Sequence, residues 1–267
     1  LGAVLGHDLV LAHVADRPAT VALELVERED YGAAVGAPVA ILRFAAPAKR
    51  AGGRRGPLPD FEVGDLLGVV PPGEIVPRFY SLASSKADGI VEICVRLMPG
   101  GVSSTRLHGL RPGDRIDAFV RGNPRFRPAA DAPSLILIGA GAGIGPLAGF
   151  VRANDGARPV HLYWGGRSPA SDFLYEHELA RHLAERRLTS LTTAFSRDPR
   201  GRTLVQDRIA ADARRLGELV RQGAQILVCG SRDMSTGVRH SLEAVLRPIG
   251  LDLATLSAGG RYVEDVY

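Results

Sequence analysis

Cysteine and lysine are both scarce in this chain of 267 residues. The two cysteines, Cys94 and Cys229, are far apart and fit neither a metal-binding spacing nor a disulfide framework. Isolated cysteines favour a reducing compartment, so a cytoplasmic protein is expected. Lys49 and Lys86 are the only lysines, so nearly all of the basic charge is arginine, and the formal net charge is +4. This charge fits an anionic ligand or an acidic protein partner.

Aromatic residues and long apolar runs are also limited. Aromatic residues make up 6% of the chain and no basic helix carries them at regular intervals, so a nucleic-acid partner is not expected. The longest uncharged run, residues 135–151, is too short to span a membrane and contains Pro146, so direct membrane contact is not expected either. The chain opens without a signal-peptide pattern and without Met. We therefore expect a piece of a longer chain, and a cytoplasmic part of a membrane-anchored protein stays open.

Residues 1–128 have the pattern of short antiparallel strands. Apolar residues alternate with polar ones around residues 21–25 and 91–97, and turn signals such as Pro112-Gly113-Asp114 separate such runs. Another turn signal is Pro71-Pro72-Gly73. Several short strands with this punctuation predict an antiparallel barrel or sandwich. The basic, glycine-rich segment 49–56 is interpreted as a solvated loop.

A different pattern begins after Pro128. Strand-like runs alternate with helix-like segments, which predicts a parallel α/β sheet. The expected strands are residues 134–139, 159–164, 188–195 and 225–229, and the expected helices are residues 145–153, 172–186, 204–220 and 235–247. We therefore expect a β domain over residues 1–128 and an α/β domain over residues 133–267.

The stretch Leu135-Ile-Leu-Ile-Gly139-Ala-Gly141-Ala-Gly143-Ile-Gly145-Pro146 is the most informative segment. Its apolar start predicts a buried strand, and its glycines allow a sharp turn that a diphosphate could approach closely. The amides at the start of the following helix would bind that anion. A tight packing turn without a ligand is the alternative for this segment taken alone.

Two groups in the first half could bind a flat anionic cofactor. Arg78-Phe79-Tyr80-Ser81 supplies a cation, aromatic rings and a hydroxyl within one strand-like run. Gly100-Gly101-Val102-Ser103-Ser104 could offer amides and hydroxyls to an anion. The alternatives are an ordinary strand whose arginine faces solvent and a plain loop that caps the turn at residues 104–107.

Together these motifs resemble the ferredoxin–NADP reductase family, specifically the reductase module of its diflavin branch, which includes sulfite reductase flavoproteins and cytochrome reductases. The resemblance runs from about residue 64 to the end of the chain. Further motifs carry it, namely Trp164-Gly-Gly-Arg167 with Asp172-Phe-Leu-Tyr175, Ala194-Phe-Ser-Arg197 with Val205-Gln-Asp207, Val228-Cys-Gly230, and the tail Gly260-Arg-Tyr-Val-Glu-Asp-Val-Tyr267. The resemblance implies FAD on an antiparallel β-barrel and NADP on the α/β half.

The resemblance also implies the site residues. The positions expected to bind FAD are Arg78, Phe79, Tyr80, Ser81, Cys94, Val95, Arg96, Gly101, Val102, Ser103, Ser104 and Tyr267. The positions expected to bind NADP are Gly141, Ala142, Gly143, Ile144, Arg167, Ser196, Arg197, Arg202, Thr203, Leu204, Val205 and Gln206. The group around the hydride path is Ser81, Cys229 and Asp265.

Specific roles follow from the same resemblance. Tyr80 is expected to stack on one flavin face, with Tyr267 on the other. Ser81 is expected to reach the reactive ring nitrogen. The pyrophosphate of FAD is assigned to Arg78, Gly101, Val102 and Ser104, and the extra phosphate of NADP to Ser196, Arg197 and Arg202. The tail from Gly260 alternates like an edge strand, which would dock Tyr267; a disordered end and a hydrophobic plug are the alternatives.

Several positions depart from the family pattern. Ala142 stands where the loop usually has Thr, Leu204 where the phosphate-binding segment usually has Tyr, and Gly237 near a usual Asp. The long helical insertion of diflavin reductases is absent, and only the loop around residues 45–63 occupies its expected place. His177 and His182 nearly imitate a zinc motif, but five positions on a helix separate their directions by about 140°, so no metal site is expected.

The function expected from these observations is hydride transfer from NADPH to FAD, followed by single-electron transfer to a flavodoxin or FMN domain or a haem protein. An NADH-linked flavin or ferric reductase is one alternative. A flavin-binding electron-relay subunit without turnover is another. A short-chain dehydrogenase is not expected because neither lysine has a tyrosine four residues before it. A phosphate-transferring P-loop is not expected because no Gly-Lys-Ser/Thr follows the glycines.

Overall fold

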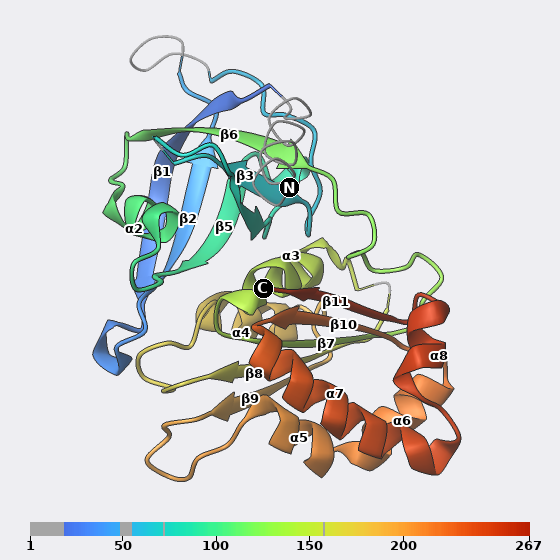
Figure 1. The fold of residues 1–267 in the computed structure, drawn as a ribbon. Coiled ribbons are helices and arrows are strands. Elements are labelled where there is room, and N and C mark those ends of the chain that lie inside the picture. The colour runs from blue at the N-terminus through green and yellow to red at the C-terminus, as the bar shows by residue number, and fades with distance from the viewer. Residues whose placement is uncertain (1–18, 49–54, 72, 157) are drawn as a thin grey trace, which may run out of the picture. The chain divides into compact units, whose positions relative to one another are not determined.

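Two sheets organise the chain, each within its own unit. The computed structural model describes residues 19–48, 55–71, 73–156 and 158–267. The first unit comprises residues 1–29 and 40–123, and the second comprises residues 30–39 and 124–267 (Figure 1). The chain therefore passes between the units three times, and the ten residues 30–39 belong with the second.

The first unit is built on a six-stranded sheet. Its strands are β1 (Val21–Tyr31), β2 (Val39–Ala45), β3 (Leu66–Val69), β4 (Arg78–Ser81), β5 (Val91–Arg96) and β6 (Arg115–Arg121), in the spatial order β4-β3-β6-β1-β2-β5. The pairs β1–β6, β3–β6 and β3–β4 are antiparallel, as the sequence pattern predicts. A bridge between Leu82, directly after β4, and Ile93 of β5 joins the two outer strands. This bridge closes the sheet into a barrel and removes its open edges.

Alternation along the strands separates the core of the barrel from its surface. In β1, Leu23 and Leu25 are fully buried, whereas Glu24 between them is partly exposed and pairs with Arg55 and Arg115. The helix α2 (Val102–Gly109) contributes Leu107 to the same core. The predicted turn at residues 112–114 is present, with Gly113 at φ 98° and its amide donating to Leu25 O.

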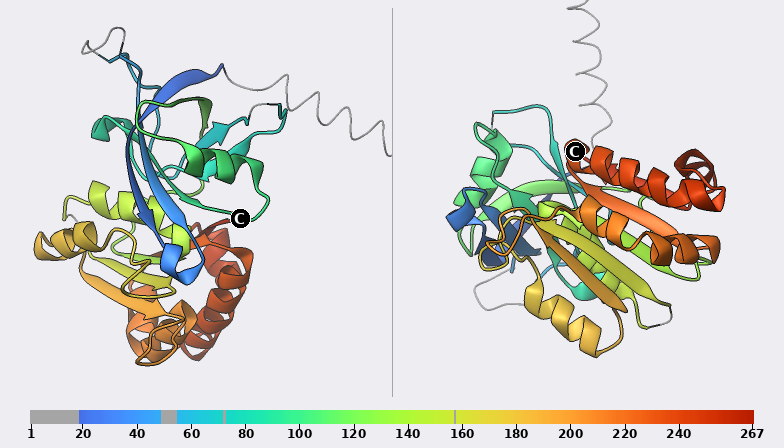
Figure 2. Two further views of the ribbon diagram at one scale, coloured as in Figure 1. Left: turned by 90° about the vertical axis from the view of Figure 1, so that its left-hand side faces the viewer. Right: turned by 90° about the horizontal axis from the view of Figure 1, so that it is seen from below.

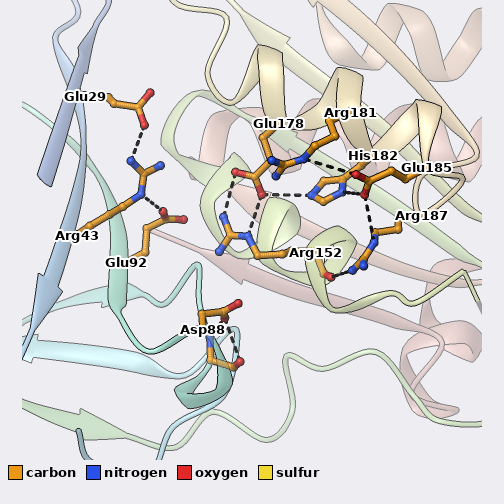
Figure 3. A network of polar contacts seen from close by, with 11 residues as sticks. Glu29, Arg43, Asp88, Glu92, Arg152, Glu178, Arg181, His182, Glu185 and Arg187 are labelled. Atoms are coloured by element: carbon orange, nitrogen blue, oxygen red, sulfur yellow. Dashed lines mark hydrogen bonds and ion pairs between the residues drawn. The ribbon is translucent and has the colours of Figure 1, made fainter.

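A buried ion pair lies among the strands of the barrel. The Arg43 guanidinium of β2 contacts Glu92 of β5 through Nε at 2.5 Å and Glu29 of β1 through Nη1 at 2.5 Å (Figure 3). Glu92 is 1% exposed. Burial alone lowers the pKa of Arg43, but the two carboxylates more than offset it, so the pKa of this guanidinium is raised. The pair therefore stays ionised and joins three strands.

The second unit is built on a parallel sheet in the order β11-β10-β7-β8-β9. Its strands are β7 (Leu135–Ala140), β8 (Val160–Gly166), β9 (Ser190–Phe195), β10 (Gln225–Gly230) and β11 (Tyr262–Val266). Helices α3 (Ile144–Ala153) and α4 (Glu176–Ala184) cover one face of this sheet. The other face carries α5 (Val205–Ala211), α6 (Ala213–Arg221), α7 (Arg232–Leu246) and α8 (Leu253–Ala258), as Figure 2 shows. The predicted parallel α/β sheet is confirmed.

The apolar run that starts the glycine-rich segment is buried on both sides. Ile136 and Ile138 pack in the cluster beneath α5 and α7, and the alternating residues Leu135 and Leu137 are equally buried. Both faces of β7 are therefore covered, which explains why the strand carries no polar position.

The structure differs from the sequence interpretation in three helices. The single helix expected over residues 204–220 is two helices, because the chain turns at Asp212, whose carboxylate accepts a hydrogen bond from the Tyr163 hydroxyl at 2.8 Å. Residues 104–107, which the alternative interpretation made a capped turn, are part of the longer helix α2. Helix α8 had no counterpart in the prediction. The solvated loop predicted for residues 49–56 falls almost entirely outside the described residues, as does Pro72.

The zinc-like pair on α4 has a structural environment. His177 is exposed, whereas His182 is buried with its Nε2 at 3.3 Å from the Glu178 carboxylate, which also pairs with Arg152 (Figure 3). Among the residues that the structure describes, no group of three or more His, Cys, Asp or Glu side chains could hold a metal ion. No helix in the described ranges is long and apolar enough to cross a membrane.

The Arg43–Glu92 pair leads to a prediction about stability. Replacing Arg43 with Met leaves the Glu92 carboxylate buried without its cation, and we expect the free energy of unfolding to fall by about 3 kcal/mol. Urea unfolding followed by circular dichroism measures this change. The double variant Arg43→Met/Glu92→Met removes both charges and should return close to the unmodified protein.

The matched control is Arg214→Met on α6, where the arginine is 94% exposed and pairs with Glu218. This variant should change the free energy of unfolding by less than about 1 kcal/mol. Equal unfolding curves for Arg43→Met and Arg214→Met would show that the buried pair does not stabilise the barrel.

Candidate functional site

The β4 strand presents its residues on two faces. Phe79 lies on the face that meets Phe119 of β6, edge to face at 5.9 Å between ring centroids, and Arg121 lies over the Phe79 ring at 5.2 Å. Gly68 stands between the two rings in the strand register, where a Cβ would lie 2.4 Å from the Phe119 ring. Phe79 therefore packs against β6, and Arg78 and Tyr80 alternate to the opposite face.

Tyr80 is tied to the start of α2. Its hydroxyl hydrogen-bonds to the buried Ser103 hydroxyl at 2.9 Å. Burial raises the pKa of the Tyr80 phenol, while the Ser103 hydrogen bond and the charge of Arg78 act in the opposite direction. The phenol therefore stays protonated, and the structure brings Arg78, Tyr80 and Ser103 together.

The first turn of α2 is open to an anion. Gly101 is its N-cap and no side chain caps the helix, so the first amides are not occupied by a capping group. The Ser104 hydroxyl accepts from Met98 N at 3.1 Å and donates to Gly101 O at 3.2 Å, which holds the turn. A Cβ on Gly101 would lie 2.7 Å from that hydroxyl. An uncapped helix start beside an arginine and an aromatic ring fits the diphosphate and ring of FAD.

The neighbouring strand β5 carries three further predicted residues. Val95 is buried in the barrel core, and its carbonyl lies 2.9 Å from His108 Nε2. Cys94 is half-buried, and burial followed by the charge of Glu92 raises the pKa of its thiol. Arg96 is exposed. Of the three, only Arg96 offers a charged side chain to solvent.

In the second unit, the glycine-rich segment packs against the end of β10. A Cβ on Gly143 would lie 2.2 Å from Cys229 O, and one on Gly139 would lie 3.1 Å from the same oxygen. Gly141 has φ 53°, and no atom lies within 4 Å of its hypothetical Cβ. Two glycines therefore serve close packing, and Gly141 faces open space.

The helix that follows has the features of an anion site. No side chain caps the N-terminus of α3, which begins at Ile144 after the short helix η3 (Gly141–Gly143). Ile144 is buried and Ala142 is partly exposed. A nucleotide diphosphate fits this open turn and uncapped helix start.

Backbone hydrogen bonds join the segments after β8 and β9. Arg197 N donates to Arg167 O at 2.7 Å, and Ser196 N donates to Gly166 O at 3.0 Å. The buried Asp172 carboxylate accepts from Arg167 N at 2.9 Å and from Ser168 N at 2.6 Å. The structure therefore brings the predicted residues Arg167, Ser196 and Arg197 together.

The rest of this predicted group lies at the start of α5. Arg202 is exposed, Thr203 N donates to Phe195 O at 3.1 Å, and Val205 is buried in the core. Leu204 N donates to the Asp207 carboxylate at 2.7 Å. Gln206 lies over Gly237 of α7, where a Cβ would come within 3.0 Å of its amide nitrogen. An aspartate at position 237 would displace this glutamine.

Residues 30–39 meet the same segments, which sequence reasoning did not anticipate. Arg197 Nη1 donates to Val35 O at 2.8 Å, and Gly32 N donates to Ser171 O at 2.9 Å. Gly32 and Gly36 both adopt left-handed conformations around η1 (Ala33–Val35). The two glycines mark a tight turn in the sequence, but nothing in the sequence pairs that turn with residues 171 and 197.

The carboxyl ends of β10 and β11 place the remaining predicted residues. Cys229 and Asp265 are direct register partners, and Tyr267 N donates to Gly230 O at 3.1 Å. Arg232 N in turn donates to Tyr267 O at 3.2 Å. The expected edge strand is therefore present and the end of the chain is docked, with the Tyr267 side chain 58% exposed. Ser81 belongs to the first unit, whereas Cys229, Asp265 and Tyr267 belong to the second.

Known protein families match residues in both units. Residues 34–122 match the family described as "Oxidoreductase FAD-binding domain", and residues 137–240 match "Oxidoreductase NAD-binding domain". The sulfite reductase (NADPH) flavoprotein alpha-component of Sodalis glossinidius (strain morsitans) is 34% identical over 238 residues, covering 80% of this chain and 39% of the relative.

Two further relatives extend the comparison. The same component of Vibrio vulnificus (strain CMCP6) is 33% identical, covering 76% of this chain and 36% of its own length. NADPH oxidoreductase A of Dictyostelium discoideum is 29% identical, covering 77% of this chain and 36% of its own length. This chain thus spans less than two fifths of these relatives. With an FAD-binding domain on an antiparallel barrel and an NAD(P)-binding domain on a parallel α/β sheet, the chain belongs to the ferredoxin–NADP reductase family, in its diflavin reductase branch.

Proposed function

We propose that this chain oxidises NADPH and passes the electrons through FAD to an acceptor protein. The observation that carries the proposal is that each unit holds an uncapped helix start suited to an anion, α2 in the first and α3 in the second. When bound, FAD accepts a hydride from NADPH and can return two electrons singly. The residues of this chain bind the two cofactors and orient them for this transfer.

The FAD diphosphate is held by Arg78 and the first turn of α2. Arg78 can bind it bidentately because a planar guanidinium matches phosphate oxygens. Tyr80 offers its ring from the same face of β4, and its hydroxyl is fixed by Ser103, so the ring loses little freedom on binding. Ser81 ends the strand and supplies a hydroxyl for the flavin ring.

The nicotinamide nucleotide is held by the carboxyl edge of the parallel sheet. The turn Gly141–Gly143 and the amides of α3 receive its diphosphate. Arg197 and Arg202 supply charge for the extra ribose phosphate, with the Ser196 hydroxyl as a further donor. Arg197 and Ser196 have backbone bonds to the Arg167 segment, which holds this subsite in shape.

Asp265 and Cys229 complete the proposed hydride path on the second unit. Nicotinamide becomes positively charged as the hydride leaves, and a carboxylate nearby would stabilise that charge. The Tyr267 ring would cover the flavin face that nicotinamide must reach, and would have to move aside for each transfer. The docked backbone of residue 267 allows its side chain to do so without undocking the strand.

The acceptor is proposed to be a flavodoxin or FMN domain or a haem protein. Support comes from the relatives, two of which are named as flavoprotein components of a sulfite reductase. A cytoplasmic location is proposed with it, and the two free cysteines Cys94 and Cys229 are consistent with a reducing compartment.

The proposal is tested by anaerobic reduction. The purified protein should contain noncovalent FAD, and NADPH should bleach the absorbance of the oxidised flavin. A flavin colour that persists under excess NADPH would favour a binding subunit without turnover. Arg78→Ala should yield a largely colourless protein, because the diphosphate loses its bidentate partner.

The matched control for Arg78→Ala is Arg115→Ala. Arg115 is an exposed arginine of the same unit whose partner is Glu24. This variant should keep the flavin content of the unmodified protein. Equal flavin content in the Arg78 and Arg115 variants would place the FAD site elsewhere.

Arg197 yields a prediction about nucleotide preference. Arg197→Ala removes a charged hydrogen bond to the extra phosphate, so we expect kcat/KM for NADPH to fall about ten- to a hundredfold, with NADH hardly affected. Arg200→Ala is the control, since Arg200 lies in the same segment, is 82% exposed and pairs with Asp198. Equal use of NADPH and NADH by the unmodified protein would contradict the proposed preference and support the NADH-linked reductase.

The tail yields a separate prediction. Tyr267→Ser keeps the two backbone bonds of residue 267 but removes the ring, so nicotinamide nucleotides should bind more tightly and discrimination between NADPH and NADH should weaken. Asp265→Asn should slow flavin reduction without changing flavin content. Stopped-flow reduction measures both effects.

The control for Asp265→Asn is Glu264→Gln. The Glu264 carboxylate accepts a hydrogen bond from the Ser235 hydroxyl at 2.9 Å, so it has a structural role on the neighbouring position of β11. If the Asp265 and Glu264 variants reduce flavin at the same rate as the unmodified protein, Asp265 does not act on the hydride path.

A further inference from the structure

Trp164 is the only tryptophan of the chain, and it contacts the glycine-rich turn. It lies in β8 as the register partner of Gly139 and is fully buried. Its indole Nε1 donates a hydrogen bond to Gly141 O at 3.2 Å. Gly141 is the first residue of the turn and faces open space. The same carbonyl also accepts from Ile144 N at the start of α3. The buried ring and the helix start therefore together hold one specific carbonyl of the proposed diphosphate site.

The ring itself is held in one place. Phe173 stacks on it with ring centroids 5.4 Å apart and an interplanar angle of 14°, and Phe195 meets it edge-on at 5.9 Å. A Cβ on Gly166 would lie 2.8 Å from the ring, so only glycine fits there. Phe173 comes from the segment after β8 and Phe195 from the end of β9. The indole therefore joins both of those segments to the glycine-rich turn.

The hydrogen bond orients the peptide group between residues 141 and 142. In a trans peptide the carbonyl and the next N–H point in opposite directions. With Gly141 O directed at the buried indole, the Ala142 amide points away from it, toward the partly exposed side of the turn. Position 142 carries no side-chain hydroxyl, so its backbone amide is the donor that residue 142 can offer to a phosphate.

We propose that Trp164 is a positioning residue for the nucleotide diphosphate, acting through the Gly141–Ala142 peptide so that the Ala142 amide faces the anion. The inference rests on the proposed function of the glycine-rich turn. It assigns a role in nucleotide affinity to a buried residue that touches no ligand.

The test uses Trp164→Phe, which keeps an aromatic ring between Phe173 and Phe195 but removes the N–H donor. The complete protein is titrated calorimetrically with NADP⁺. We expect the dissociation constant to rise about 3- to 10-fold, the effect of one neutral hydrogen bond, while FAD content and kcat at saturating NADPH are retained.

A second probe separates a local effect from general damage. Adenosine 2′-monophosphate carries the extra ribose phosphate but has no phosphate on its 5′-oxygen, so Trp164→Phe should bind it as the unmodified protein does. Adding Ala142→Ser to Trp164→Phe supplies a hydroxyl donor at the same position and should recover part of the lost NADP⁺ affinity. Equal weakening of both ligands, or no recovery with the added serine, would overturn the proposal.

Tyr163→Phe is the matched control. Tyr163 is the neighbouring buried residue of β8 on the opposite face of the sheet, and the variant loses the hydrogen bonds of its hydroxyl to Asp212 and Thr192. The Tyr163→Phe variant should bind NADP⁺ with the affinity of the unmodified protein.

If the unmodified protein binds NADP⁺ and Trp164→Phe binds it equally well, the role of Trp164 is refuted and the proposed function stands. If the unmodified protein does not bind NADP⁺, the proposed function itself fails.

Discussion

The second unit depends on a backbone contact that leaves no room for a side chain. Gly143 approaches the carbonyl of Cys229 so closely that a Cβ would lie 2.2 Å from the oxygen. This contact brings the turn after β7 against the end of β10, and the start of α3 thereby lies beside the strand whose register partner carries Asp265. A larger residue at position 143 would have to separate the turn from β10, and with it the proposed anion-binding helix start from the Asp265 carboxylate.

Hydrophobic periodicity predicted the architecture because each strand and helix has its own pattern. Local burial determines which positions of a strand are apolar, so the order of apolar and polar residues indicates it. This holds for the alternation around residues 21–25 and 91–97 and for the apolar run of β7. The break between α5 and α6 cannot be predicted in this way. It depends on a hydrogen bond to Asp212 from Tyr163, a residue 49 positions earlier in the chain. Such long-range contacts override local helix preference and cannot be derived from a local window.

The candidate site was predictable to a similar extent. The groups at residues 78–81 and 100–104 and the glycine-rich turn could be named from their chemistry, whereas the other site residues were implied only by the family resemblance. The structure brings Arg78, Tyr80 and Ser103 together in one unit. Sequence reasoning missed the partners that hold these groups in place. Phe79 packs against Phe119, and Trp164 was named only as the first residue of the motif Trp164-Gly-Gly-Arg167, without its contact to the glycine-rich turn. Both contacts depend on strand register or on the position of a backbone carbonyl, and neither can be inferred from the type of residue.

The turn at residues 30–39 bears on how the protein can be dissected. Its flanking strands β1 and β2 lie largely in the first unit, but the turn belongs to the second, where it supplies the carbonyl that Arg197 binds and donates to Ser171. A nucleotide-binding fragment obtained by cutting the gene at residue 124 would lack this piece, and Arg197 would lose its anchor. Nucleotide affinities measured on such a fragment would describe a less ordered arginine, so the intact chain is the proper material for comparing natural and engineered cofactor preferences.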